Sequence, residues 1–286
     1  MNVSPDQTRI EHHLTISCFD GGKVAALFRE RRLYEHSEML GASPSETQIL
    51  LQKLATLQNS IYRLDQYGER CWRPDERLLK LLWEAIAKSL SAFHLPSDLQ
   101  SEACTEIHAY QGVELAMREG TSPAATGIRQ FYRLKTCDVR LARRLLARQL
   151  DAQGDTLLAT AWDLYDLASE VCDDLSDGEE DSRTYNANRF FISLASRDPK
   201  ITLSEYATFL GWLHKQATSV RALGSKEIAP AASDLIARWI ERRVGWAHNE
   251  LTRWQKHFAE PVPARVPIST LVGFFKPASP PKGVKP

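Results

Sequence analysis

The chain has 286 residues, with 36 lysine plus arginine and 36 aspartate plus glutamate residues, so its formal net charge is zero. A balanced charge does not favour nucleic acid or an anionic membrane as a partner, because both attract a basic surface. Apolar residues make up 43% and charged residues 25%, which is usual for a soluble globular protein. The length allows one large helical domain or two small ones.

Three features of the sequence predict a cytoplasmic protein without a transmembrane segment. The five cysteines form no CxxC pair and are odd in number, which favours reduced thiols over a disulfide framework. The N-terminus lacks the charged and then apolar segments of a signal peptide. No apolar run approaches the roughly 18 residues that a membrane-spanning helix needs.

Most of the chain has the 3.6-residue apolar period of an α-helix, and alternating strand patterns are scarce. Ser43-Pro-Ser-Glu46 resembles a capping box and opens an apolar run that reaches Leu64. A second helix is expected after Pro74, as far as Leu90. Further helices are expected at about residues 98–119, 124–150, 155–177, 203–223 and 228–258. The predicted fold class is all-α, with a single helical domain over residues 1–258.

The last stretch, residues 259–286, has a different composition. It carries seven prolines and therefore cannot form a long helix. Its apolar patch, Leu271-Val-Gly-Phe-Phe275, is flanked by lysines. Two interpretations remain open: a disordered tail, or a segment that docks onto the helical body, a partner or a membrane surface.

The segment from Glu170 to Asp181 contains seven acidic residues and no basic one. On a helix, four of its carboxylates fall on one face at positions i, i+3, i+4 and i+7: Glu170, Asp173, Asp174 and Asp177. Like charges this close repel one another, so a folded helix keeps them readily when cations neutralise them. Mg²⁺ prefers carboxylate oxygens and typically takes one or two of them together with substrate phosphates. The pattern therefore indicates a diphosphate held through metal ions.

A solvated helix face is the alternative interpretation of this segment. Asp163 and Asp166 continue the acidic stripe toward the N-terminus at helical spacing, as on the exposed side of an ordinary amphipathic helix. The spacing alone does not separate the two interpretations.

The segment that precedes the acidic one, residues 131–144, is strongly basic. It contains Lys135-Thr136 and, one helical turn further on, Arg140. A lysine next to a hydroxyl can contact a phosphate directly, through the charge of the ammonium and a hydrogen bond from the hydroxyl. A row of arginines at helical spacing is more commonly solvated surface.

Lys135-Thr136 followed by Asp173-Asp174-x-x-Asp177 resembles the trans-prenyl diphosphate synthases, a family in the class I isoprenoid synthase superfamily. Those enzymes carry a Lys-Thr pair on one helix and a Phe-Gln-x-x-Asp-Asp-x-x-Asp motif on a later helix. This chain departs from that motif in having Ser-Glu where the family has Phe-Gln.

A second resemblance overlaps the first. The run Asp177-Gly-Glu-Glu-Asp181, followed by Tyr185, is similar to the second acidic motif of squalene and phytoene synthases. These enzymes share the fold of the trans-prenyl diphosphate synthases, so the two resemblances agree on the class and differ on the reaction.

The upstream half of the chain matches the family less closely. Leu64-Asp65-Gln-Tyr-Gly-Glu69-Arg70 is the best match to the family's first aspartate-rich motif, with Gln66 in place of the second aspartate. Gly21-Gly-Lys23 is similar to the start of the motif that binds the homoallylic diphosphate, but the Arg-x-Arg-Pro part is absent.

The resemblance implies an antiparallel helical bundle around a deep apolar cavity, with two acidic motifs facing each other across its mouth. It implies Mg²⁺ as cofactor, held by Asp65, Glu69, Asp173, Asp174 and Asp177. It implies that the substrate diphosphate is bound by Lys135, Thr136, Arg70 and Arg140. Asp173, Asp174 and Lys135 would be the catalytic residues. A homodimer is expected by analogy with the family.

The implied function is ionisation of an allylic prenyl diphosphate, by a transferase or a lyase. We rank prenyl transfer ahead of cyclisation, because the second motif is of the elongating type and lacks the Asn/Ser/Glu triad of bacterial cyclases. The incomplete Gly-Gly-Lys region argues against a full second pocket for isopentenyl diphosphate, so a terpene cyclase stays an alternative. Another alternative is a catalytically inactive binding or regulatory subunit, since the first motif lacks an aspartate. An unrelated bundle would instead place Asp173, Asp174 and Asp177 on the solvent face.

Overall fold

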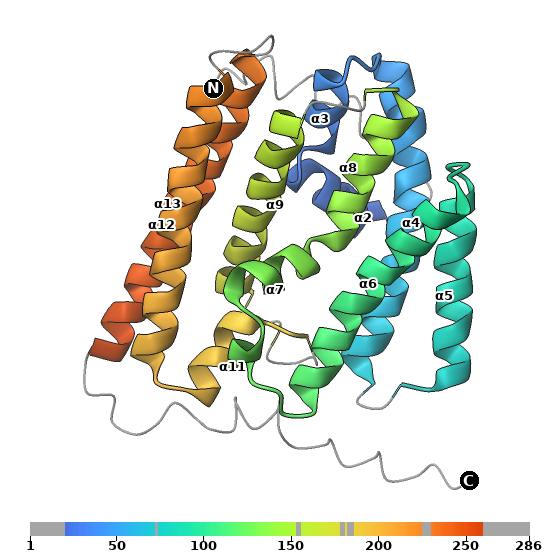
Figure 1. The fold of residues 1–286 in the computed structure, drawn as a ribbon. Coiled ribbons are helices and arrows are strands. Elements are labelled where there is room, and N and C mark those ends of the chain that lie inside the picture. Colours follow the sequence, from blue (N-terminus) through green and yellow to red (C-terminus); the bar gives the residue numbers. More distant parts are fainter. Residues whose placement is uncertain are drawn as a thin grey trace, which may run out of the picture. The chain divides into compact units, whose positions relative to one another are not determined.

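A computed structural model describes residues 21–71, 74–152, 156–177, 181, 186–224 and 230–259. Within these ranges the regular structure is entirely helical, which confirms the all-α prediction (Figure 1). None of the helices in the described ranges combines the length and the apolar character needed to cross a bilayer. The Pro-rich tail and Tyr185 lie outside the described residues.

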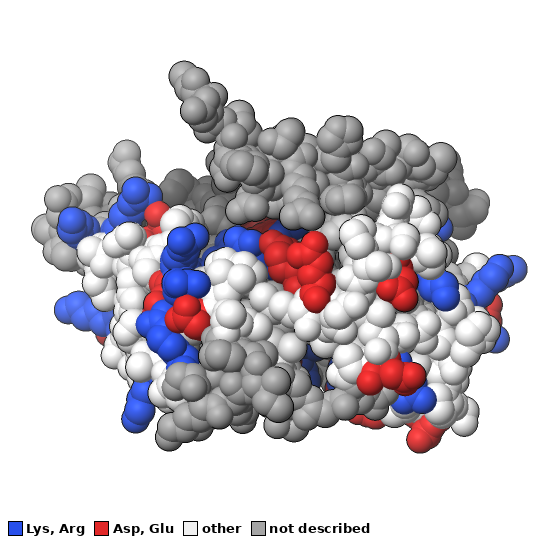
Figure 2. Space-filling model, turned by 90° about the horizontal axis from the view of Figure 1, so that it is seen from above, with Lys and Arg blue, Asp and Glu red and all other residues white. Residues whose placement is uncertain are grey.

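The chain forms two compact units whose segments alternate along the sequence. The predicted single domain over residues 1–258 stays a prediction. The first unit comprises Met1–Leu64, Arg77–Cys104 and Asp138–Asp155. The second comprises Asp65–Glu76, Thr105–Cys137 and Thr156–Pro286. Acidic and basic side chains both occur among the described residues on the face shown in Figure 2.

Among the described residues of the first unit, the helices are α2 (Gly21–Glu30), α3 (Leu33–Met39), α4 (Pro44–Arg70) as far as Leu64, α5 (Glu76–Ser91) from Arg77 onward, the first part of α6 (Ser97–Arg118) and α8 (Cys137–Gln149) from Asp138 onward. The predicted capping box is present at the start of α4. The Ser43 backbone N–H donates to Glu46 at 2.9 Å, and the Ser43 hydroxyl accepts from the Glu46 backbone N–H at 3.3 Å. This reciprocal pair satisfies backbone donors at the helix start, where Pro44 occupies the first position.

The second unit contains the last residues of α4, the larger part of α6, the short 3-10 helix η1 (Pro123–Ala125), α7 (Ile128–Lys135), α9 (Thr156–Ser176), α11 (Arg189–Ser196), α12 (Pro199–Gly224) and α13 (Pro230–Ala259). Helices α12 and α13 lie side by side and both pack on α9 (Figure 1). Between α9 and α13, the ring of Trp162 contacts those of Tyr165 and Trp239, at centroid distances of 5.7 and 5.8 Å. Helix α9 is therefore the central helix of this unit.

The helix predicted at 124–150 is divided at Thr136 into α7 and α8. Thr136 is fully buried, and its hydroxyl donates to the backbone carbonyls of Tyr132 and Arg133. Side-chain bonds of this kind compete with the regular helical ladder and favour a bend or an end. As a consequence, Lys135 lies at the end of α7.

Candidate functional site

The acidic stripe of α9 lies largely inside the second unit. The side chains of Asp166 and Asp174 are fully buried, and Glu170 is 8% exposed, so these three at i, i+4 and i+8 share a buried face. Asp173 is half-buried and Asp177 is exposed. A solvated face therefore does not describe Asp166, Glu170 or Asp174.

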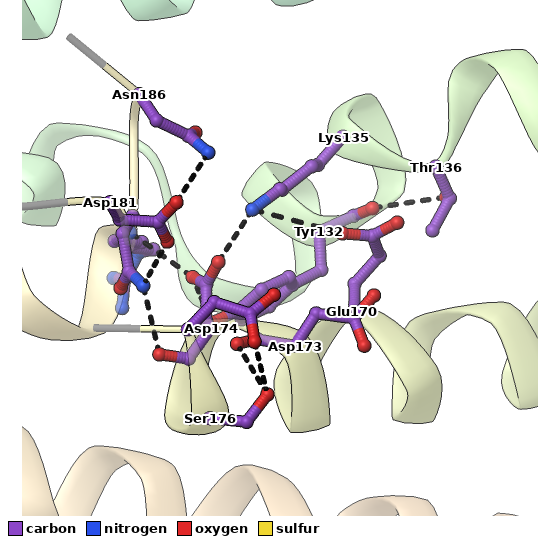
Figure 3. Close-up of polar contacts among 12 residues, drawn as sticks. Tyr132, Lys135, Thr136, Glu170, Asp173, Asp174, Ser176, Asp181 and Asn186 are labelled. Carbon is purple, nitrogen blue, oxygen red and sulfur yellow. Dashed lines mark hydrogen bonds and ion pairs between the residues drawn. The ribbon is translucent and has the colours of Figure 1, made fainter. Parts of the chain in front are cut away.

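Asp174 receives three hydrogen bonds through its two carboxylate oxygens. The Lys135 ammonium lies 2.5 Å from one oxygen, and the Tyr132 hydroxyl donates to the other at 2.8 Å (Figure 3). The backbone N–H of Arg189 donates to that second oxygen at 3.1 Å. A fully buried carboxylate needs such partners, since burial without them costs several kcal/mol, about 1–3 even for a single missing hydrogen bond. In this arrangement Asp174 holds Lys135 in place, and its predicted role as a metal ligand stays a prediction.

Lys135 also lies near a second carboxylate, with its Nζ 3.7 Å from Glu170 Oε2. Burial lowers the pKa of Lys135, but the carboxylates of Asp174 and Glu170 outweigh burial and hold the pKa above its ordinary value. The side chain therefore stays a cation throughout the physiological pH range. A fixed positive charge at the end of α7 suits a diphosphate ligand.

Tyr110 on α6 connects the two acidic segments. The pKa of its hydroxyl is raised well above the ordinary value, first by burial and then by the carboxylates of Glu114, Glu170, Asp174 and Asp65. These four acids come from α4, α6 and α9. The first and the second predicted motif therefore each contribute a carboxylate that raises the pKa of this hydroxyl. That the two motifs face one substrate stays a prediction.

Glu114 is a member of this site that the sequence did not predict. Burial raises the pKa of its carboxyl, while Arg118, a hydrogen bond from Tyr110 and then Lys135 lower it, and Glu69 raises it further. Tyr110, Glu114 and Arg118 recur at four-residue intervals on one face of α6, but no motif distinguishes that face from an ordinary amphipathic one.

The first motif occupies the end of α4. Asp65 and Glu69 are both half-buried, and Arg70, the last residue of the helix, is exposed. The Arg118 guanidinium donates to the backbone carbonyl of Gly68 at 2.8 Å, so α6 is tied to α4 beside Glu69. This contact fixes where the Glu69 backbone lies relative to Glu114.

The residues predicted to bind the diphosphate differ in their hydrogen bonding and in the unit to which they belong. The Thr136 hydroxyl donates to the backbone carbonyls of Tyr132 and Arg133, as described above. Arg140 lies on α8 and belongs to the first unit. The roles of Thr136, Arg70 and Arg140 toward a diphosphate stay predictions.

Asn186 and Asn188 connect the segment before α11 to the acidic residues. Asn186 donates to one oxygen of Asp181 at 2.8 Å, and Asn188 donates to the other at 2.7 Å (Figure 3). Asn188 also donates to the backbone carbonyl of Asp174 at 2.8 Å and caps α11 by accepting from Phe191. Through these bonds Asn188 joins the end of α9 to the start of α11.

Burial raises the pKa of Asp181 to about 6, although the bond from Asn188 opposes this. An unfolded aspartate titrates near 3.8, so between about pH 4 and pH 6 the folded protein binds the extra proton. The free energy of unfolding consequently falls as the pH rises through this window. We expect Asp181→Asn to remove this fall, which is on the order of 1 kcal/mol for a group partly screened by solvent. Urea denaturation of wild type and Asp181→Asn at several pH values measures how the free energy of unfolding changes with pH. The same change in both proteins would contradict the prediction.

The carboxylates of the site suit Mg²⁺ in kind, since it is a hard ion that prefers oxygen ligands. In the described ranges, no three His, Cys, Asp or Glu side chains stand together as a ready-made metal site. Mg²⁺ typically takes one or two carboxylates and completes its shell with water and substrate phosphate. The partly exposed acids that could do so are Asp65, Glu69, Asp173 and Asp177.

A groove of about 720 Å³ lies between α7 and α12, apart from these carboxylates. Its apolar lining includes Ile128, Ile201, Phe209 and Trp212. The Arg129 guanidinium lies over the Trp212 ring, 4.5 Å from its centroid. This open groove is not the deep cavity implied between the acidic motifs, and that cavity stays a prediction.

Comparison of the chain with protein-family models, with curated proteins and with solved structures gave no match. The function has therefore to be inferred from the geometry and chemistry of the site.

Proposed function

We propose that the protein is a Mg²⁺-dependent class I isoprenoid synthase that ionises an allylic prenyl diphosphate, with prenyl transfer favoured over cyclisation. The observation that carries the proposal is the position of the Lys135 ammonium between two carboxylates of α9, 2.5 Å from Asp174 and 3.7 Å from Glu170. Carboxylates of α4 and α6, together with those of α9, also raise the pKa of Tyr110. A set of carboxylates from several helices next to one fixed lysine suits a ligand that brings both phosphate charge and metal ions.

In this proposal Asp65, Glu69, Asp173 and Asp177 would hold Mg²⁺ at the substrate diphosphate. When bound, the ions supply Lewis-acid stabilisation of the leaving group. Lys135 contributes a permanent positive charge, kept in place by Asp174. Such fixed charges stabilise a transition state without the reorganisation that water would need.

The reaction breaks the allylic C–O bond, and the bonding electrons leave with the diphosphate. In prenyl transfer the double bond of a second prenyl diphosphate then attacks the allylic carbon, and loss of a proton restores neutrality at the new double bond. In cyclisation the attacking double bond belongs to the same molecule. The half-buried position of the Tyr110 ring suits a site that has to limit the access of water to the carbocation.

Product analysis tests this proposal. The purified protein and Mg²⁺ are incubated with C10, C15 and C20 allylic diphosphates, each with and without isopentenyl diphosphate. Longer diphosphates that form only with isopentenyl diphosphate would establish prenyl transfer, and hydrocarbons or alcohols from one substrate would establish a cyclase. If no substrate is consumed under any condition, the catalytically inactive subunit becomes the better interpretation.

A further inference from the structure

The hydroxyl groups of Tyr132 and Tyr206 form a directed pair that ends on Asp174. Tyr132 has one hydroxyl proton and donates it to the Asp174 carboxylate at 2.8 Å. Its 2.7 Å bond to the Tyr206 hydroxyl must therefore be donated by Tyr206. Both tyrosines are fully buried, so water does not compete for these protons.

Aromatic packing holds both rings in place. The ring of Tyr132 stacks on Phe209 at 5.8 Å and meets Phe131 edge-on at 5.4 Å. The ring of Tyr206 meets Phe190 edge-on at 4.9 Å. A hydroxyl on a ring packed in this way cannot swing to another partner without opening the core.

Arg189 closes the arrangement from α11. Its guanidinium is fully buried, lies 5.9 Å from the centroid of the Tyr206 ring and donates to Glu205 at 2.7 Å. Its backbone N–H donates to Asp174. The position of the Asp174 carboxylate is thus set by residues of α7, α11 and α12 together.

We propose that Tyr132 and Tyr206 are positioning residues that act on Lys135 through Asp174. A lysine has a flexible four-carbon stem, so its ammonium must be fixed to meet a substrate group repeatedly in one place. Asp174 does this directly, and the two hydroxyls fix Asp174. The role rests on the proposed function, in which Lys135 meets the substrate diphosphate.

The test compares Tyr132→Phe and Tyr206→Phe with Tyr165→Phe, which removes a hydroxyl from another buried tyrosine of the same unit. We expect Tyr132→Phe to lower kcat by about 10–100-fold, as is typical when a partner of a site residue is removed, with a smaller change in KM. Tyr206→Phe, one bond further away, should show a smaller loss of the same kind. Tyr165→Phe should change neither constant.

A double-mutant cycle separates positioning from general packing. If Tyr132 acts through Lys135, Tyr132→Phe should cause no further loss of kcat in a Lys135→Met background. If Lys135→Met does not fold, Lys135→Arg serves as the background. The loss of kcat caused by Tyr132→Phe should then be smaller than it is in wild type. If Tyr132→Phe lowers kcat equally in wild type and in the Lys135 variant that folds, the positioning role is overturned.

Calorimetric titration of inorganic pyrophosphate in the presence of Mg²⁺ provides a readout besides turnover, in which Tyr132→Phe should weaken binding more than Tyr165→Phe does. If the wild type is active and Tyr132→Phe matches Tyr165→Phe in every constant, the positioning role alone is overturned. If the wild type neither turns over a prenyl diphosphate nor binds pyrophosphate, the proposed function fails and this role fails with it.

Discussion

Asp174→Ala is expected to lower the free energy of unfolding by about 3–5 kcal/mol, the range for breaking a buried ion pair by removing one partner. The substitution leaves the Lys135 ammonium, which is 13% exposed, without its nearest carboxylate. It also leaves the buried Tyr132 hydroxyl without its acceptor. Urea denaturation of wild type and variant at neutral pH measures the difference.

Asp173→Ala is the matched control, because it removes the neighbouring carboxylate on the same helix from a half-buried position. Its effect on the free energy of unfolding should stay within about 1 kcal/mol, since substitutions away from buried networks are usually mild. Equal effects of the two substitutions would contradict the buried pair between Lys135 and Asp174.

Asp65→Asn and Asp173→Asn are each expected to lower kcat by about 10²–10³-fold, the loss typical when one preorganised electrostatic contact to the transition state is removed. Asparagine keeps the shape of aspartate and loses the charge with which the proposed site holds Mg²⁺. Initial rates of product formation over a range of Mg²⁺ concentrations measure the effect. Higher Mg²⁺ should restore part of the activity if a ligand has been weakened.

Asp163→Asn is the control for these variants, since it removes a half-buried carboxylate from the same helix, well before Asp173. It should keep wild-type kcat and wild-type Mg²⁺ dependence. If Asp65→Asn and Asp173→Asn behave as Asp163→Asn does, the two motifs do not act together on the substrate and the proposed metal ligands are wrong.

The long helices could be predicted because many turns repeat the same apolar period. The start of α4 could be predicted because Ser43 and Glu46 form a local capping box. Helices α2, α3 and α11, of ten, seven and eight residues, are too short to show that period clearly. The end of α7 at Lys135 depends on hydrogen bonds from the Thr136 hydroxyl to backbone carbonyls. The sequence around Thr136 favours a helix, so it gives no sign of this end.

The acidic face of α9 could be predicted from spacing, but the separate roles of Asp173 and Asp174 could not. Adjacent residues on a helix point about 100° apart, so one faces the core while the other is partly exposed. Which of the two is buried depends on how α7 and α11 pack on α9. Glu114, Tyr206 and Arg189 reach the site through tertiary contacts and carry no local signal.

The alternation of the two units along the chain has a consequence for how the protein can be synthesised and divided. The second unit takes segments from three parts of the chain, and α9 is packed by α12 and α13, which follow it in the sequence. During translation the buried face of α9, with Asp174, therefore emerges before the helices that cover it. Neither unit corresponds to a continuous fragment, so a chain cut between α8 and α9 would leave both halves with exposed apolar surface, a state that favours aggregation.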